Sequence, residues 1–276
     1  MAIIEGWLPP TRAHYDLILR VWQFAFPPLA SIQWLVRWYP MGKTSVASRL
    51  NLPGRVAWMT MEAPGFLTLL YLMSTMPERH GIDDLPWQNR VLGGLFVIHY
   101  SYRAIAFPSC SPPWRPSTPS SGPPPCASSS STPPASAPGC PPTGPSPPTP
   151  GPRSRSLPQF ALGMLLFYVG LAGNFSTTRS CARFAAAPPP SSASSSPPTA
   201  KAGLFRYMLY PHYFCEWVEW LGFVMAAGWT CAPAWAFLVN EVVSMLPRAV
   251  NGKRWYVERF GADKVGKKWA IIPGVL

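Results

Sequence analysis

The chain has 276 residues, of which 48% are hydrophobic and 12% charged, against roughly a quarter charged in ordinary soluble domains. It contains 13 Trp, 14 Phe and 10 Tyr and carries a net charge of +12. This composition argues against a soluble globular domain. The basic residues form no run suited to nucleic acid, so membrane topology explains them better than a polyanionic partner does.

Six apolar stretches approach the ~20 residues needed to cross a bilayer. They lie at about 15–36, 56–76, 88–107, 159–175, 213–230 and 232–246. The first is the least regular because it contains Asp16, Arg20 and Pro27-Pro28, and the last two are close enough to form a tight helical hairpin. We therefore predict an all-α fold, a polytopic transmembrane helical bundle with about six visible spans.

Two stretches of different composition interrupt this pattern. Of the 37 prolines in the chain, 24 lie in 108–158 and 188–198, where Pro, Ser and Thr dominate and no apolar run occurs. Such a composition cannot bury enough apolar surface to form a packed core. We predict that 108–158 and 180–200 are low-complexity segments, either disordered or mistranslated.

The distribution of charge predicts which connections lie in the cytosol. Basic residues mark four regions: 37–55, which contains no acidic residue, the end of the third span at Arg103, 179–206 and the tail after 246. The positive-inside rule places these in the cytosol and the acidic connection 77–90 in the lumen. The spans 88–107 and 159–175 would then both end in the cytosol, so a further crossing is required between them, where the sequence offers no apolar run.

A series of short blocks carries a more specific signal. In chain order they are Gly42-Lys43-Thr44-Ser45, Asn51-Leu52-Pro53-Gly54, Ala57 through Pro64, His99-Tyr100-Ser101-Tyr102-Arg103, Gly163 through Phe167 with Asn174, Ala202 through Phe205, Pro211 through Gly222, Pro247-Arg248-Ala249, Trp255-Tyr256 and Ile271-Ile272-Pro273. Together and in this order they resemble the steroid 5α-reductase family. The resemblance covers residues 37–107, 160–175 and 202–276.

The resemblance implies one membrane reductase domain over 1–276, with seven spans in the family, in the endoplasmic reticulum membrane. It also implies an oxidoreductase of the 3-oxo-5-alpha-steroid 4-dehydrogenase type. Such an enzyme uses NADPH to reduce the carbon–carbon double bond of a 3-oxo-Δ4 steroid or a similar enone lipid. Alternatives are enoyl-CoA or polyprenol reduction within the same superfamily, or a catalytically inactive membrane protein. Neither a metal nor a nucleic acid is expected as a partner.

Two residues are candidates for the reacting centre. Glu62 lies inside an apolar span, where a carboxylate is costly and is by default a functional hypothesis. The resemblance assigns it, with Tyr100, to polarising the substrate ketone. A phenol suits this role because it can supply a proton or a hydrogen bond as an enolate develops. The alternatives are a carboxylate paired with a neighbouring span and a tyrosine that anchors a helix end at the interface.

The resemblance also implies a cofactor set. It consists of Arg103, Asn174, His212, Glu216, Arg248 and Tyr256. The guanidinium of Arg248 can fork onto a phosphate, although it could instead be a positive-inside anchor. The family usually has Asn where His212 stands. No Gly-x-Gly-x-x-Gly motif follows a strand, so we expect NADPH to enter the bundle from the basic cytosolic side, without a Rossmann site.

The family pattern breaks after Phe107 and after Phe175, and each break can be explained by a change of reading frame. Permitted codons for Ser176 through Phe184, read two bases in, encode His-Asp-Glu-Ile-Leu-Arg-Glu-Ile, which resembles the missing family motif. The stretch from Pro108 to Gly122, read at the same offset, resembles the family's loop and the start of its fourth span. Restoring the frame would supply the absent crossing, whereas the alternative is a genuine Pro/Ser-rich loop.

Overall fold

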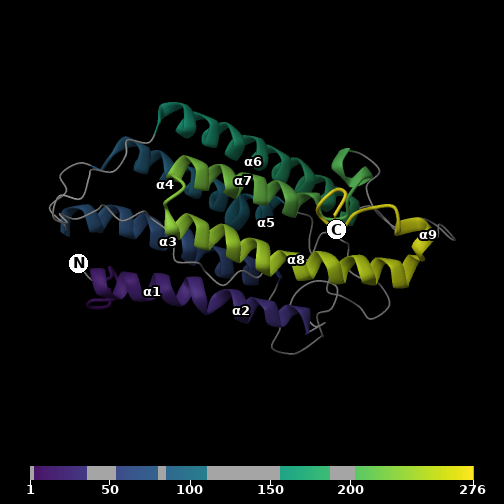
Figure 1. The fold of residues 1–276 in the computed structure, drawn as a ribbon, viewed down its shortest axis with the longest axis horizontal. Coiled ribbons are helices and arrows are strands. Elements are labelled where there is room, and N and C mark those ends of the chain that lie inside the picture. The colour runs from purple at the N-terminus through teal and green to yellow at the C-terminus, as the bar shows by residue number, and fades with distance from the viewer. Residues whose placement is uncertain (1–2, 36–53, 80–84, 111–155, 187–202, 276) are drawn as a thin grey trace.

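The computed structural model of the chain describes residues 3–35, 54–79, 85–110, 156–186 and 203–275 (Figure 1). Within these residues the regular secondary structure is entirely helical, apart from three isolated β-bridges. This confirms the all-α prediction for the described part of the chain. The long helices lie side by side with their axes roughly aligned, so the fold is a bundle.

The first predicted span, 15–36, is divided into shorter helices. α1 spans Arg12–Phe24, α2 spans Phe26–Ser31 and the 3-10 helix η1 spans Ile32–Trp34. Pro27 and Pro28 account for the division, because a proline lacks the N–H that an inner turn requires and clashes with the carbonyl four residues earlier. The Thr11 hydroxyl accepts a hydrogen bond from the His14 N–H and caps the start of α1.

The second and third spans form neighbouring helices. α3 spans Gly54–Arg79 and α4 spans Trp87–Tyr100. α4 continues into the π-helical turn η2, Ser101–Ala106, and then into α5, Phe107–Cys110. A π-helical turn is rare and often occurs at a functional position. It directly follows Tyr100 and contains Arg103.

The C-terminal half contains the longest helices. α6 spans Leu157–Ala186, α7 spans Pro211–Ala227 and α8 spans Ala232–Phe260, with the short helices η3, Gly203–Arg206, and α9, Ala262–Val265. α7 and α8 form the predicted hairpin, with Gly228 at a φ of 97° in the connection. α6 continues past the predicted end at 175. The rest of 180–200, like 111–155, lies outside the described residues.

Small residues allow α6 and α7 to approach very closely. A Cβ atom on Gly163 would meet the backbone of Ala226, and a Cβ atom on Gly222 would meet the backbone of Phe167. Glycine permits this contact because it has no side chain, and small residues play the same part between helices in membranes. The contact therefore fixes the register of α6 against α7.

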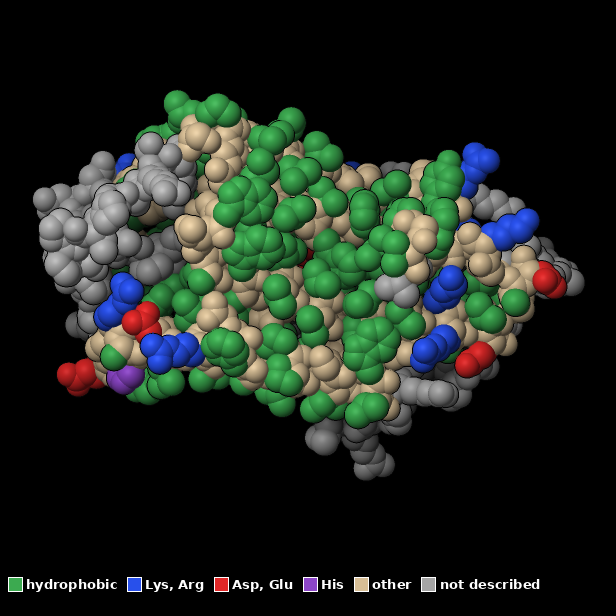
Figure 2. Space-filling model, viewed as in Figure 1, with side chains coloured by type: hydrophobic (Ala, Val, Ile, Leu, Met, Phe, Trp, Pro, Cys, Tyr) green, Lys and Arg blue, Asp and Glu red, His purple; other side chains and the backbone are tan. Residues whose placement is uncertain are grey.

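Two described helices are long and apolar enough to cross a membrane, at Arg55–Glu78 and Leu157–Ser180. The prediction of six spans is not confirmed: α4 has 14 residues before the π-helical turn, α7 has 17, and α8 carries charged residues along its length. The outer surface is nevertheless apolar, since Leu162, Leu165 and Val169 of α6 are more than half exposed. Figure 2 shows hydrophobic side chains over the middle of one face and charged ones gathered toward its ends.

α4 and α6 run in the same direction. At one end Trp87, at the start of α4, packs against Phe160, with 5.2 Å between their ring centroids. At the other end Tyr102 of η2 packs against Phe175 of α6 at 4.7 Å. α5 and the start of α6 therefore lie at opposite ends of the bundle, which agrees with the prediction from charge that the spans 88–107 and 159–175 both end on the same side.

Candidate active site

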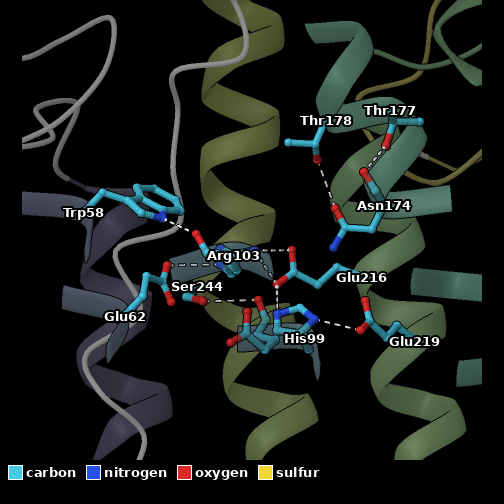
Figure 3. Close-up of polar contacts among 11 residues, drawn as sticks. Trp58, Glu62, His99, Arg103, Asn174, Thr177, Thr178, Glu216, Glu219 and Ser244 are labelled. Carbon is cyan, nitrogen blue, oxygen red and sulfur yellow. Dashed lines mark hydrogen bonds and ion pairs between the residues drawn. The ribbon is translucent and has the colours of Figure 1, made fainter. Parts of the chain in front are cut away.

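Arg103 lies at the centre of a buried polar cluster (Figure 3). Its Nη1 donates to both carboxylate oxygens of Glu216, at 2.7 and 2.8 Å, and its Nε donates to Oε1 of Glu62 at 3.0 Å. The indole N–H of Trp58 donates to the Arg103 carbonyl at 2.9 Å, and the guanidinium lies 5.4 Å from the centre of the Trp58 ring. One side chain of η2 thus connects α3 to α7.

His99 extends the cluster along α7. Its Nδ1 lies 2.7 Å from Oε1 of Glu219, and its Nε2 lies 3.8 Å from Oε1 of Glu216. Glu216 and Glu219 lie three residues apart, so they share one face of α7 and both turn toward His99. All three side chains are almost completely buried. The carboxylates are therefore held by fixed partners within the bundle.

Asn174 joins the same cluster from α6. Its side-chain carbonyl accepts a hydrogen bond from the Thr178 hydroxyl at 3.1 Å, and its amide also interacts with Glu219. The Thr177 hydroxyl donates to the backbone carbonyls of Gly173 and Asn174, which keeps the Thr177 side chain against its own helix. Asn174 is therefore oriented from the α6 side of the cluster.

Tyr100 and Glu62 both lie inside the bundle, with exposed fractions of 6% and 4%. The Tyr100 ring packs 4.6 Å from the ring of Phe96 and 5.0 Å from that of His99. The Tyr100 hydroxyl lies within the electrostatic influence of Glu62, Glu241, Arg103 and Glu216. Neither candidate for the reacting centre is an outward-facing anchor.

The remaining cofactor candidates lie farther along the bundle. Arg248 of α8 donates from Nε to Oε1 of Gln33 at 3.0 Å, and the Asn251 amide donates to the Gln33 carbonyl. This contact joins the basic half of α8 to η1. Arg248 also lies within the electrostatic influence of Glu241, so it connects the Arg103 cluster with this half of the helix.

His212 and Tyr256 belong to a second, aromatic cluster. The His212 ring lies 4.5 Å from that of Tyr213 and 5.9 Å from that of Tyr210. Tyr256 is buried in the hydrophobic cluster that contains both tyrosines, and burial raises the pKa of its hydroxyl above the ordinary value. The six predicted cofactor residues are thus divided: Arg103, Asn174 and Glu216 lie together, while His212 and Tyr256 belong to the aromatic cluster.

Three residues of the site were not predicted from the sequence as site residues: His99, Glu241 and Gln33. Glu241 carries the same signal that identified Glu62, because it is a carboxylate inside a predicted apolar span. Gln33 carries no such signal, since an amide at a helix end is ordinary. Among the described residues, no group of three or more His, Cys, Asp or Glu side chains is arranged to hold a metal ion.

An all-helical bundle with a buried cluster of carboxylates, guanidinium and imidazole is typical of a membrane-type enzyme, in which such groups face the interior. Residues 153–276 match the family described as 3-oxo-5-alpha-steroid 4-dehydrogenase. This C-terminal part of the chain is therefore similar to an oxidoreductase family, the steroid 5-alpha-reductases, which the sequence motifs also resemble.

Some relatives are similar to this chain over most of its length. An uncharacterized protein of Schizosaccharomyces pombe is 29% identical over 270 residues, which is 85% of this chain and 90% of the relative. The 3-oxo-5-alpha-steroid 4-dehydrogenase 1 of Rattus norvegicus is 28% identical and covers 82% of each chain. Polyprenal reductase 1 of Oryza sativa subsp. indica is 34% identical over 65 residues, or 24% of this chain and 18% of the relative.

Proposed function

We propose that the chain is a multi-pass membrane reductase of the endoplasmic reticulum. It would use NADPH to reduce the carbon–carbon double bond of a 3-oxo-Δ4 steroid or a similar enone lipid. The observation that carries this proposal is the burial of Glu62, Tyr100 and Arg103 together in the interior of a helical bundle. The similarity of residues 153–276 to the 3-oxo-5-alpha-steroid 4-dehydrogenase family supports the reaction class.

In this proposal the chain's own residues polarise the ketone. Negative charge accumulates on the ketone oxygen in the transition state, and a preorganised donor in a dry site stabilises it strongly. Tyr100 is the donor, because its hydroxyl can also release a proton to the α-carbon. Arg103 donates to Oε1 of Glu62, so we assign Glu62 to orienting the Arg103 guanidinium, whose positive charge adds to the polarisation of the ketone. Bound NADPH would supply the hydride.

The residues of α8 and its neighbours fit this cofactor chemically. Arg248 offers a guanidinium to a phosphate, and Asn174 offers an amide near the Arg103 cluster. Asn240 of α8 is 2% exposed, and neither of its amide atoms has a hydrogen-bond partner among the described residues. A buried amide without partners requires an explanation, and a bound polar ligand provides one.

The test is an assay of the membrane-embedded chain with NADPH and a 3-oxo-Δ4 steroid. NADPH oxidation would be followed together with the mass of the lipid product. We expect a product two mass units heavier than the substrate, formed in proportion to the NADPH consumed. Failure to bind NADPH would exclude both reductase readings and favour the inactive membrane protein.

One observation favours a second substrate class. Polyprenal reductase 1 of Oryza sativa subsp. indica resembles a short part of the chain. A polyprenal supplied in the same assay would identify this activity by reduction of the polyprenal in place of the steroid. The longer coverage of the steroid dehydrogenase relatives favours the steroid or enone reading.

A further inference from the structure

Glu241 is a buried carboxyl group to which no role has been assigned above. It lies in α8 with an exposed fraction of 2%, and its Oε2 has no hydrogen-bond partner among the described residues. Glu62 of α3, Arg103 of η2, Glu216 of α7 and Arg248 of α8 all act on it electrostatically. Glu241 therefore faces the interior of the cluster and does not face lipid.

The charges around Glu241 do not balance if every carboxyl group is ionised. The described cluster holds four buried carboxyl groups, on Glu62, Glu216, Glu219 and Glu241. Glu62 and Glu216 receive the hydrogen bonds of Arg103, and Glu219 pairs with His99. Arg248 is hydrogen-bonded to the neutral amide of Gln33. Even with His99 protonated, the four carboxyl groups therefore face three cations, Arg103, His99 and Arg248.

An ionised carboxylate without a donor is strongly disfavoured in a dry interior. The Oε2 atoms of Glu219 and Glu241 both lack a hydrogen-bond partner among the described residues, but Glu219 is paired with His99 through Oε1. The proton that balances the cluster therefore belongs on Glu241, whose side chain has no such donor. Tyr100 and Glu241 lie at the same level of the bundle. Phe96, one turn before Tyr100 on α4, packs 5.8 Å from Phe237, one turn before Glu241 on α8, and the two helices run in the same direction (Figure 1).

We propose that Glu241 carries a proton in the resting protein and returns a proton to Tyr100 after each turnover. The proposal rests on the function proposed above. Hydride addition at the β-carbon moves the π electron pair of the double bond to the ketone oxygen, forming an enolate. The enolate takes the Tyr100 proton at its α-carbon, and the tyrosinate takes the proton of Glu241. Glu241 acts through Tyr100 and is thus a positioning residue for the proton.

The sequence of α8 provides a route by which Glu241 can recover its proton. Ser244 and Arg248 follow at three and seven residues, so all three lie on one face of the helix. Ser244 and Arg248 are buried, with exposed fractions of 1% and 5%. Beyond Arg248 the helix carries Lys253 and Arg254 at its basic end. A polar line thus leads from Glu241 toward the end that we assign to the cytosol.

Infrared spectroscopy tests the proton on Glu241 without requiring activity. The full chain would be measured in a detergent that has no carbonyl group, in H2O and in D2O. We expect the carbonyl band of a protonated carboxylic acid, shifted by D2O and absent from Glu241→Gln. Glu219→Gln is the matched control and should retain the band, because Glu219 is paired with His99. A band that persists in Glu241→Gln, or no band in the parent, would overturn the proposal.

Measurements of enone turnover then distinguish a failure of this inference from a failure of the proposed function. In a parent that reduces an enone, Glu241→Gln should lower kcat by about 10²-fold, as expected for a lost acid, with little change in KM or NADPH affinity. Glu241→Asp should recover part of the rate because it restores the acid. A band that depends on Glu241 in a protein that reduces no enone would refute the proposed function alone. Full turnover by Glu241→Gln would refute the relay alone.

Discussion

Gly170 of α6 lies directly against the backbone of Glu219 in α7, so closely that a Cβ atom on Gly170 would collide with the nitrogen and Cα of Glu219. The register of the two helices is therefore set at the level of the carboxylate that His99 contacts. Asn174, one turn beyond Gly170 on α6, is held beside Glu219 by the same packing. The close approach of two backbones thus positions one side of the polar cluster.

Gly170→Ala should destabilise the protein by about 1–3 kcal/mol, the usual cost of overpacking, because the neighbouring atoms belong to rigid backbone. Gly94→Ala in α4 is the matched control. A Cβ atom there meets nothing within 4 Å, and alanine favours a helix over glycine by about 1 kcal/mol. Thermal unfolding in detergent should show a lower Tm for Gly170→Ala and an unchanged or higher Tm for Gly94→Ala. Equal Tm values would contradict the contact.

Arg103→Met should cost about 3–5 kcal/mol of stability, because it leaves the carboxylates of Glu62 and Glu216 buried without their cation. Adding Glu62→Gln and Glu216→Gln should restore much of the loss. Arg12→Met provides the comparison, since Arg12 and Asp16 form a pair with exposed fractions of 64% and 40%. Such a pair contributes about 0–1 kcal/mol. Chemical denaturation would measure all three proteins, and equal effects of the Arg103 and Arg12 changes would refute a bridging role.

Tyr100→Phe should slow enone reduction by about 10²–10³, the usual effect of removing one donor to a developing oxyanion. NADPH affinity should remain close to that of the parent, because the phenol acts on the substrate in the proposed mechanism. Steady-state kinetics and an NADPH fluorescence titration would separate the two effects. A large loss of NADPH binding with unchanged kcat would place Tyr100 in the cofactor site instead.

Arg248→Ala should raise the Kd for NADPH by about 10–10²-fold, the equivalent of a charged hydrogen bond worth about 1.5–3 kcal/mol. Arg254→Ala is the control on the same helix, since Arg254 is exposed. A fluorescence titration would compare the two variants with the parent. If Arg254→Ala weakened binding as much as Arg248→Ala, the effect would come from general basic charge and not from a specific phosphate contact.

The chain with both stretches restored to the alternative frame should reduce an enone, and the chain as written should be inactive or nearly so. The motivation is the absent crossing between α4 and α6 and the family motif missing after Asn174. Sequencing the transcript across codons 105–205 would test the frame itself. Expression of both versions would test the consequence, and equal activity would show that the Pro/Ser-rich stretches are tolerated insertions.

The sequence predicts the helices well because long apolar runs leave few alternatives. Pro27-Pro28 marks the first span as irregular in sequence, but the prediction kept 15–36 as one span, whereas the structure divides it into α1, α2 and η1. The prediction also ends α6 too early, because Ser176 and Ser180 read as polar. In the structure their hydroxyls donate to carbonyls three or four residues earlier in the same helix, which satisfies them internally.

Side-chain partnerships are harder to predict than helices. Motifs identify Glu62, Tyr100 and Glu216, but only packing shows that Arg103 joins two of these carboxylates. The pairing of His99 with Glu219 spans 120 residues in sequence and depends on the register of α7 against its neighbours. Gln33 could not be predicted as a partner of Arg248, because its role arises only where η1 meets α8.

Because Arg103 lies in the π-helical turn Ser101–Ala106, its position depends on the number of residues in this segment as well as on their identity. An α-helix turns about 100° with each residue, so one surplus residue rotates everything beyond it unless a wide turn absorbs the addition. Deleting one residue here would convert the π-helical turn to an ordinary helical turn and move Phe107 away from Trp58. The ring centroids of Phe107 and Trp58 now lie 6.5 Å apart. No substitution at a single position could reproduce that displacement, so this segment is far more sensitive to a lost codon than to an exchanged one.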